Sequence, residues 1–182
     1  MSQTRLARIL ERLESMLREL LDVSRIRSGI GLAFELEAVR LDVLAREVVQ
    51  EMKGMHGERL GLHVEVPTIG AWNRAGLRRV LENLIVNALK YGSQDKPVSI
   101  TVTQNTSHAT LTVHNDGNPI PAEDQPLLFE KFLRASTAKS TTGWGLGLAL
   151  VCGMVKAHHG SVRLESSQAR GTDFIVELPK KP

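Results

Sequence analysis

The stretch RVLENLIVNALKYG, residues 79–92, decides how the rest of this sequence is interpreted. Its apolar residues recur at helical spacing and form one face of a predicted helix: Val80, Leu81, Leu84, Ile85, Ala88 and Leu89. Asn83 and Asn87 lie four residues apart, so their side chains share one stripe of that helix. Lys90 continues the same side one turn later, and the helix is expected to end at Gly92.

The polar stripe of this helix suggests a particular chemistry. An Asn amide offers the hard oxygen that Mg²⁺ accepts, and a Lys ammonium attracts phosphate. With the phenol of Tyr91 beside them, two amides and an amine could hold a metal–phosphate group together with a planar ring. The alternative is a buried helix whose amides are satisfied within the protein. The helix alone does not decide between the two interpretations.

Three further blocks follow along the chain. HNDGNPIP, residues 114–121, comes after an alternating strand, LFEKF follows at 128–132, and GWGLGL at 143–148 opens another helix. In this order and at these separations, the four blocks resemble the N, G1, F and G2 boxes of a histidine-kinase ATP-binding domain. That domain belongs to the superfamily of the gyrase and Hsp90 ATPases. The resemblance covers nearly the whole chain, and the four boxes together are highly specific, whereas any one alone is weak.

The resemblance implies a role for each matching residue. On the helix, Asn87 would be the Mg²⁺ ligand, and Asn83 would support the phosphates and the metal from one turn earlier. Lys90 would contact phosphate, and Tyr91 would border the nucleoside. Arg134 is placed to reach the γ-phosphate when an ATP lid closes, and the alternative for it is a solvated surface arginine.

The glycine-rich blocks would bind the nucleotide through the backbone. The run from Gly143 to Gly147 lets N–H groups approach phosphate at a helix N-terminus, where the helix dipole also favours anions. The residues implied to line the nucleotide in these blocks are Asn115, Gly117, Pro119, Ile120, Phe132, Gly143, Trp144, Gly145, Leu146, Gly147 and Leu148. Phe129 and Phe132 are better explained as anchors of the lid in the core than as ligand contacts.

Two residues depart from the family pattern. The adenine-binding Asp of the family aligns with Asn115 rather than with Asp116. This register follows from Val113 before it and from residues 117–120 after it. The second glycine of that box is Pro119, which stiffens the loop and resembles the form in phytochrome-like kinases.

As a histidine kinase, the protein would bind Mg-ATP and transfer the γ-phosphoryl group to a histidine, for onward transfer to a response regulator. The acceptor helix of such a kinase carries a histidine followed by an acidic residue. None of the six histidines lies in that context, so we expect the acceptor to be absent from this sequence.

Two other functions remain open. In ATP hydrolases of the gyrase or Hsp90 kind, a Glu general base precedes the metal-binding Asn by four residues. That position is Asn83 here, and Glu82 is turned about 100° round the helix. The other possibility is a non-enzymatic nucleotide-binding or scaffolding module that dimerises through its first helix. The phosphate-contacting residue types are all present, which argues against it.

Composition limits the class of protein. The 182 residues are 42% hydrophobic and 24% charged, typical of a soluble globular protein. The net charge of +3 comes from interspersed charges, so nothing indicates a nucleic-acid surface. One cysteine excludes an internal disulfide and fits a reducing compartment. The longest uncharged run, residues 140–155, is too short for a membrane span, and the first twenty residues carry both charge signs, unlike a signal peptide. We therefore expect a cytoplasmic chain without membrane contact.

Residues 1–30 are predicted to form a separate long helix. Its apolar residues keep a three–four spacing: Leu6, Ile9, Leu10, Leu13, Met16, Leu17, Leu20 and Val23. Such a face belongs to a helix that packs in a bundle, and the alternative is a helix folded back on its own domain. Residues 20–29, LLDVSRIRSG, resemble the end of the second dimerisation helix of a histidine kinase, which implies a homodimer. The catalytic domain is then residues 31–182.

Periodicity predicts the elements of that domain. Alternating apolar residues indicate strands at 34–38, 62–66, 98–104, 108–115, 161–166 and 172–178. Besides the central helix, which Asn73 would cap, helices are predicted at 42–53, with Asp42 as the cap, and at 146–155.

The remaining stretches predict loops and complete the fold class. Residues 117–126 and 135–143 lose all period, and the family places its ATP lid there. His158 and His159 follow the last helix and are expected to complement its C-terminus rather than bind metal. The predicted fold is an α/β (α+β) sandwich: a mixed sheet covered on one face by about three helices, preceded by the long bundle-forming helix.

Overall fold

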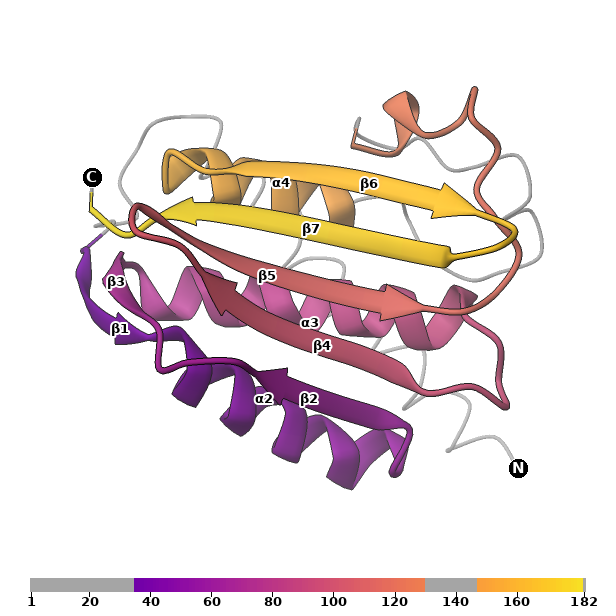
Figure 1. Ribbon diagram of the computed structural model, residues 1–182, viewed down its shortest axis with the longest axis horizontal. Coiled ribbons are helices and arrows are strands. Elements are labelled where there is room, and N and C mark those ends of the chain that lie inside the picture. The colour runs from indigo at the N-terminus through magenta and orange to yellow at the C-terminus, as the bar shows by residue number, and fades with distance from the viewer. Residues whose placement is uncertain (1–34, 130–146, 182) are drawn as a thin grey trace, which may run out of the picture.

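The computed structural model describes residues 35–129 and 147–181 (Figure 1). In chain order the elements are β1 (Glu37–Arg40), α2 (Leu41–His56), β2 (Leu60–Val64), β3 (Ile69–Trp72), α3 (Arg74–Tyr91), β4 (Val98–Gln104), β5 (His108–Asn115), the 3₁₀-helix η1 (Pro126–Phe129), α4 (Gly147–Ala157), β6 (Ser161–Ser167) and β7 (Gly171–Pro179). The predicted helix at 1–30 and the predicted loop at 135–143 lie outside the described residues. No helix within the two described ranges has the length and apolar character that crossing a membrane requires.

The main sheet is mixed, as predicted. Its five strands have the order β2-β4-β5-β7-β6. β2 runs parallel to β4, and every other neighbouring pair is antiparallel. A parallel pair needs a long crossover, and here that crossover contains β3 and α3. β1 and β3 form a separate two-stranded antiparallel sheet.

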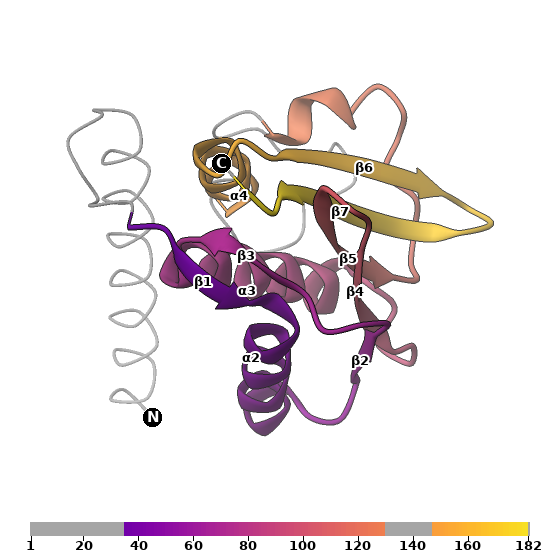
Figure 2. The ribbon, with the colours of Figure 1, turned by 60° about the vertical axis from the view of Figure 1, so that its left-hand side comes forward.

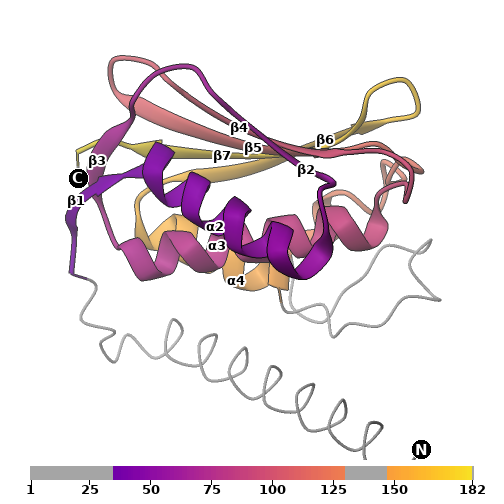
Figure 3. The same ribbon diagram turned by 90° about the horizontal axis from the view of Figure 1, so that it is seen from below.

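All three helices cover one face of the main sheet (Figures 2 and 3), so the predicted sandwich is confirmed. α3 is the middle helix and packs against both α2 and α4. Alternate strand residues face the helices, because side chains along a strand alternate between its two faces. The buried set includes Val98, Ile100 and Val102 on β4, Ala109, Leu111 and Val113 on β5, Leu44 and Val48 on α2, Leu84 and Ile85 on α3, and Leu150 and Val151 on α4. Burial of each large aliphatic side chain contributes about 1.5–3 kcal/mol.

The start of α3 is fixed by a cap and by a buried tryptophan. The Asn73 side-chain oxygen accepts a hydrogen bond from the Gly76 N–H at 2.7 Å, which confirms the predicted N-cap. Trp72 is fully buried, and its indole N–H donates to the Pro179 carbonyl at 2.8 Å. The first turn of α3 is therefore tied to the last strand of the sheet.

His158 connects the start of α3 with the end of α4. Its Nε2 accepts the Asn73 backbone N–H at 2.9 Å, and its Nδ1 donates to the Met154 carbonyl at 2.8 Å. These bonds need the neutral imidazole, because Nε2 has to be the unprotonated nitrogen. Burial lowers the pKa of His158 from its ordinary value, in agreement with that form. His158 therefore lies at the predicted helix end but acts there as a neutral hydrogen-bonding group.

The predicted cap of α2 by Asp42 is wrong. The N-cap position is Arg40, whose side chain makes no capping bond, and Asp42 lies inside the first turn. The Asp42 carboxylate is buried and accepts bonds from the Arg40 guanidinium, at 2.9 and 2.6 Å, and from the Thr68 N–H at 3.1 Å. The hydrogen bond from Arg40 lowers the pKa of Asp42 to about 2. Tertiary partners thus use the oxygen atoms that a cap would have needed.

The strand boundaries differ from the predictions in the first half of the domain. β1 covers Glu37–Arg40, whereas a strand was predicted at 34–38. β3 was not predicted, because IGAW is short and has no alternating pattern. β2 begins at Leu60 and ends at Val64, two residues earlier than predicted at each end, and Val66 lies beyond it and is exposed. β4 and β5 have the predicted bounds, and β6 and β7 contain the predicted strands.

Candidate functional site

The polar stripe of α3 faces the start of α4. The Asn83 amide nitrogen donates to the Arg79 carbonyl one turn earlier at 2.9 Å, which fixes the side chain with its oxygen next to Gly147. A Cβ atom placed on Gly147 would lie 2.7 Å from that oxygen. The absence of a side chain at Gly147 is therefore what lets α4 begin against Asn83.

Asn87 lies one turn further along and is half-buried. Within the part of the chain that the structure describes, its side chain makes no hydrogen bond, so its amide oxygen is available to a ligand. Neither described range contains a group of three or more His, Cys, Asp or Glu residues suited to a metal ion. Two amide oxygens on one stripe suit Mg²⁺, which commonly keeps several waters and takes its remaining ligands from phosphate.

Lys90 and Tyr91 complete the stripe at the end of α3. The Lys90 ammonium lies 4.9 Å from the centre of the Tyr91 ring, in a cation–π contact. Lys90 is half-buried and Tyr91 is exposed. The charge is therefore held beside the last turn of the helix, on the side of the two amides.

The loop after β5 packs against this same end of α3. The Ser93 N–H donates to the Asp116 carbonyl at 2.7 Å. Two glycines allow the close approach. A Cβ on Gly92 would lie 3.0 Å from the Asn115 Cβ, and a Cβ on Gly117 would lie 3.1 Å from the Tyr91 carbonyl oxygen. Asn115 is thus brought beside the helix that carries Asn87, although the two residues are far apart in sequence.

Asn115 ends β5 and points to the helix side of the sheet, where it is only 5% exposed. Its amide nitrogen donates to the Asp116 carbonyl at 3.3 Å. This bond favours the orientation in which the amide oxygen remains as the group offered to a ligand.

Sequence reasoning missed two polar neighbours of Asn115. Thr172 on β7 is opposite Asn115 in the sheet register and is only 4% exposed. Ser166 on β6 is opposite Thr172, and the two hydroxyl oxygens lie 2.8 Å apart. The signal in the sequence was weak: polar residues at positions where the strand period predicts core side chains. Only the cross-strand register brings these residues to Asn115.

Arg59 was also missed. From the turn before β2, its guanidinium donates to the Ser93 carbonyl at 2.5 Å and to the Lys96 carbonyl at 3.2 and 3.1 Å. It thereby holds the loop that follows α3. No local pattern in the sequence indicates this role, because Arg59 and Ser93 are 34 residues apart.

Several predicted site residues lie outside the described residues: Phe132, Arg134, Gly143, Trp144, Gly145 and Leu146. Gly147 and Leu148 begin α4, and Leu148 packs against the core. Pro119 and Ile120 lie in the loop after β5 and are half-buried. Phe129, at the end of η1, also packs against the core, as predicted.

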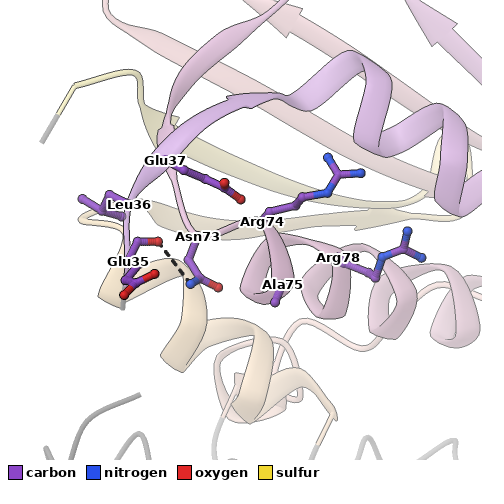
Figure 4. A pocket seen from close by; sticks show the side chains of 7 residues that line it. All are labelled: Glu35, Leu36, Glu37, Asn73, Arg74, Ala75 and Arg78. Atoms are coloured by element: carbon purple, nitrogen blue, oxygen red, sulfur yellow. Dashed lines mark hydrogen bonds between the residues drawn. The ribbon is translucent and has the colours of Figure 1, made fainter. Parts of the chain in front are cut away.

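A groove of about 660 Å³ lies at the other end of α3 (Figure 4). It is lined by Glu35, Leu36, Glu37, Asn73, Arg74, Ala75 and Arg78. Its two arginines are already paired across to α2: Arg74 with Glu47, and Arg78 with Glu51 at 2.7 Å. This groove contains none of the predicted site residues and offers no uncompensated cation to a phosphate.

The described site therefore has three parts. α3 supplies amide oxygens and an ammonium, the start of α4 lies against the first amide, and the end of the sheet supplies a buried polar row. Hard oxygens and positive charge suit a metal–polyphosphate, and the buried row of donors and acceptors suits a planar polar ring.

Comparisons with known proteins identify the family. Residues 72–182 match the family described as "Histidine kinase-, DNA gyrase B-, and HSP90-like ATPase". The chain is 30% identical over 172 residues to the "Heme sensor protein HssS" of Staphylococcus saprophyticus, covering 93% of this chain and 37% of that protein. It is 33% identical over 183 residues to the "Signal transduction histidine-protein kinase/phosphatase MprB" of Mycobacterium leprae, covering 95% of this chain and 34% of that protein. The chain thus spans about a third of the length of these relatives.

A solved structure supports the same assignment. Full-length ShkA in complex with AMPPNP superposes with a TM-score of 0.83 at 25% identity, covering 97% of this chain and 37% of that one. The fold and the family match agree with one another. The chain therefore belongs to the histidine kinase-, DNA gyrase B- and HSP90-like ATPase family and contains the catalytic ATP-binding domain of a sensor histidine kinase.

Proposed function

We propose that this protein binds Mg-ATP between α3, the start of α4 and the loop after β5, and donates the γ-phosphoryl group to a histidine on a separate helix. The observation that carries the proposal is the arrangement of Asn83 and Asn87 on one stripe of α3, beside both Gly147 and the buried Asn115. This arrangement offers hard oxygens for a cation and a polar row for a base within one site.

Each residue would contribute by position and charge. Mg²⁺, when bound, would neutralise phosphate charge, with Asn87 as its protein ligand and Asn83 supporting the phosphates. Lys90 would bind phosphate, Tyr91 would border the nucleoside, and Arg134 would reach the γ-phosphate. In the transfer, an imidazole nitrogen forms a bond to the γ-phosphorus, the bond from that phosphorus to the β–γ bridging oxygen breaks, and ADP leaves.

Hydrolysis is the less supported activity. A hydrolase needs a base to activate water, and the position one turn before Asn87 is occupied by Asn83, whose amide nitrogen is bonded to the backbone. Glu82 is 41% exposed at its side chain and lies 3.6 Å from the Arg78 guanidinium, on the side of α3 that faces α2. We therefore expect slow ATP hydrolysis in the absence of an acceptor.

The wider role follows from the family. We propose that residues 1–30 form the second dimerisation helix and that residues 31–182 form the catalytic domain of a homodimeric, cytoplasmic kinase unit. The phosphohistidine would then pass its phosphoryl group to a response regulator. The loop with Pro119 in place of a glycine would be of the phytochrome-like kind.

Phosphoryl transfer can be tested directly. The chain is incubated with γ-labelled ATP, Mg²⁺ and a separate acceptor helix that carries a histidine, and acid-labile label on that helix is measured. We expect label with the unchanged chain, little with Asn87→Ala, and normal labelling with Val86→Ala, a matched control on the 44% exposed neighbour. Acid-labile label on the chain's own histidines at stoichiometric level, or none on the helix, would contradict the proposal.

A further inference from the structure

One row of residues crosses all five strands of the main sheet at its end nearest the site. The strand registers align Leu60, Val98, Asn115, Thr172 and Ser166. The first two are core residues, whereas the last three are polar and lie on the same, helix-covered face. Of these polar residues, Asn115 and Thr172 are buried and need hydrogen-bond partners, since burying a polar group without one is costly, and Ser166 is half-buried.

Ser166 supplies the connection between this row and the loop after β5. Its Oγ accepts the Ile120 backbone N–H at 3.0 Å and lies 2.8 Å from the Thr172 Oγ1. The Gln125 side-chain amide donates to the Ile120 carbonyl at 2.9 Å. Both backbone polar groups of Ile120 are thus held, one by the sheet and one by Gln125.

The other end of this loop is held independently. The Asp116 carbonyl accepts the Ser93 N–H at 2.7 Å, next to the last turn of α3. Residues 117–119 therefore lie between an anchor on α3 and an anchor on β6. Ser166 is at the second anchor and does not need to touch a ligand to influence what binds there.

We propose that Ser166 is a positioning residue for base recognition: its hydroxyl fixes the loop at Ile120 and orients the Thr172 hydroxyl beside Asn115. This inference rests on the proposed function, because it concerns how the same site reads the nucleotide base. It predicts that loss of the Ser166 hydroxyl weakens binding of the base and leaves binding of the triphosphate unchanged.

The direction of the hydrogen bonds gives the reason. A serine hydroxyl has one hydrogen and two lone pairs, and Ser166 uses one lone pair to accept from Ile120. A hydroxyl that accepts a bond becomes a better donor, so we assign Ser166 as the donor in its bond to the Thr172 oxygen. The Thr172 hydrogen then remains to donate to a ring nitrogen of a ligand. Without the Ser166 hydroxyl, Thr172 has no fixed orientation and Ile120 has no partner in the sheet.

Ser166 is half-buried, so water can replace its hydroxyl and the fold should survive Ser166→Ala. Ser166→Thr keeps the hydroxyl on a β-branched side chain that suits a strand. Ser167→Ala is the matched control, because Ser167 is the next residue, is exposed and lies on the opposite face of the sheet. Gln125→Ala releases the Ile120 carbonyl and also removes a long bond, 3.5 Å, from the same amide to the Ser166 carbonyl, while it leaves the Ser166 hydroxyl in place.

The test measures dissociation constants of the full chain for Mg-ATP and for the magnesium complex of ribose 5-triphosphate, which lacks the base. In Ser166→Ala we expect Mg-ATP to bind about tenfold more weakly, the effect of one lost hydrogen bond, and ribose 5-triphosphate to bind as before. Ser166→Thr should restore most of the affinity, Gln125→Ala should show a smaller loss confined to Mg-ATP, and Ser167→Ala should match the unchanged chain. Amide exchange at Ile120 should accelerate in Ser166→Ala while Val113 stays protected.

The possible results distinguish a failure of the proposed function from a failure of the inference about Ser166. If the unchanged chain does not bind Mg-ATP, the proposed function fails. If it binds and Ser166→Ala weakens both ligands equally or neither, the inference about Ser166 is overturned and the proposed function stands. Failure of Ser166→Thr to improve on Ser166→Ala would also overturn it, since the hydroxyl would then not be the active feature. Should Ser166→Ala not fold, an equal loss for both ligands in Gln125→Ala overturns it.

Discussion

Gly147→Ala provides a strong test of the contact between α3 and α4. The added Cβ would lie 2.7 Å from the Asn83 Oδ1, a separation that real Cβ atoms do not reach, so one of the two groups has to move. Asn83 cannot simply turn aside, because its amide nitrogen is bonded to the Arg79 carbonyl at 2.9 Å. Alanine at Gly147 should therefore break that bond or displace the start of α4.

The magnitude follows from the groups involved. Loss of the amide–carbonyl bond costs about 1 kcal/mol, and alanine gains a few tenths of a kcal/mol over glycine at the first residue of a helix. Gly147→Ala should thus lower the free energy of unfolding by about 0.5–1 kcal/mol. In the Asn83→Ala background the obstacle is gone, and the same substitution should raise the free energy of unfolding by a few tenths of a kcal/mol. The expected coupling between the two positions is about 1 kcal/mol.

Urea unfolding of the unchanged chain, the two single variants and the double variant gives the coupling energy. Gly54→Ala is the control for helix propensity, because nothing lies within 4 Å of a Cβ on Gly54 in α2, and it should stabilise by about 0.5–1 kcal/mol. Additive effects of Gly147→Ala and Asn83→Ala, to within about 0.3 kcal/mol, would refute the reasoning. A coupling of the opposite sign would refute it as well.

Three further predictions follow from single residues. Asn115→Asp should sharpen the preference for ATP over GTP in competition binding, because a charged carboxylate repels the guanine carbonyl more strongly than the neutral Asn115 amide oxygen does; equal selectivity in both proteins would mean that Asn115 does not read the base. Burial lowers the pKa of His158, so the unfolded chain binds a proton before the folded chain does as the pH falls below about 6.5, and the free energy of unfolding decreases. His158→Gln should therefore weaken the pH dependence of the free energy of unfolding, measured with urea, between about pH 6.5 and 5. An unchanged pH dependence would contradict this. The hydrogen bond from Arg40 holds the pKa of Asp42 at about 2, below its ordinary value of 3.8. The ionised Asp42 therefore contributes its full stabilisation of the fold above pH 3.8, and this contribution is lost as the pH falls through 2. Asp42→Asn should therefore lower the free energy of unfolding by about 1–2 kcal/mol at pH 7, a range that allows for solvent screening at the half-exposed Arg40. Near pH 1.5, where Asp42 is protonated, the substitution should leave that free energy unchanged. Equal losses at both pH values would exclude the ion pair as the cause.

Local patterns predicted the parts of this domain that local physics determines. The central helix was predicted because its apolar spacing and the cap at Asn73 act within a few residues. β4 and β5 were predicted with their bounds because each strand alternates cleanly and one face of the sheet is buried. The stripe of Asn83 and Asn87 follows from the helical period alone.

Features that depend on distant partners could not be predicted in this way. Asp42 has the chemistry of a cap, and only the neighbouring Thr68 and Arg40 explain why it does not act as one. β3 needs β1 as its partner, because four residues without alternation carry no strand signal. Ser166 and Thr172 lie next to each other at the site because of the register of β6 and β7, which a single sequence does not specify.

The site is built from pieces that are fastened separately. α3 and α4 are tied at one end of the pair by the His158 bond to Asn73, and further along by the contact of Gly147 with Asn83. Two attachments along one helix pair restrict sliding of α4 relative to α3. The spacing between the amide stripe and the start of α4 is therefore set before any ligand binds, which reduces the ordering that binding would otherwise require. The loop after β5 is held at Ile120 by a hydrogen bond to Ser166, so the part of the site proposed to bind the base also needs less ordering when a ligand binds.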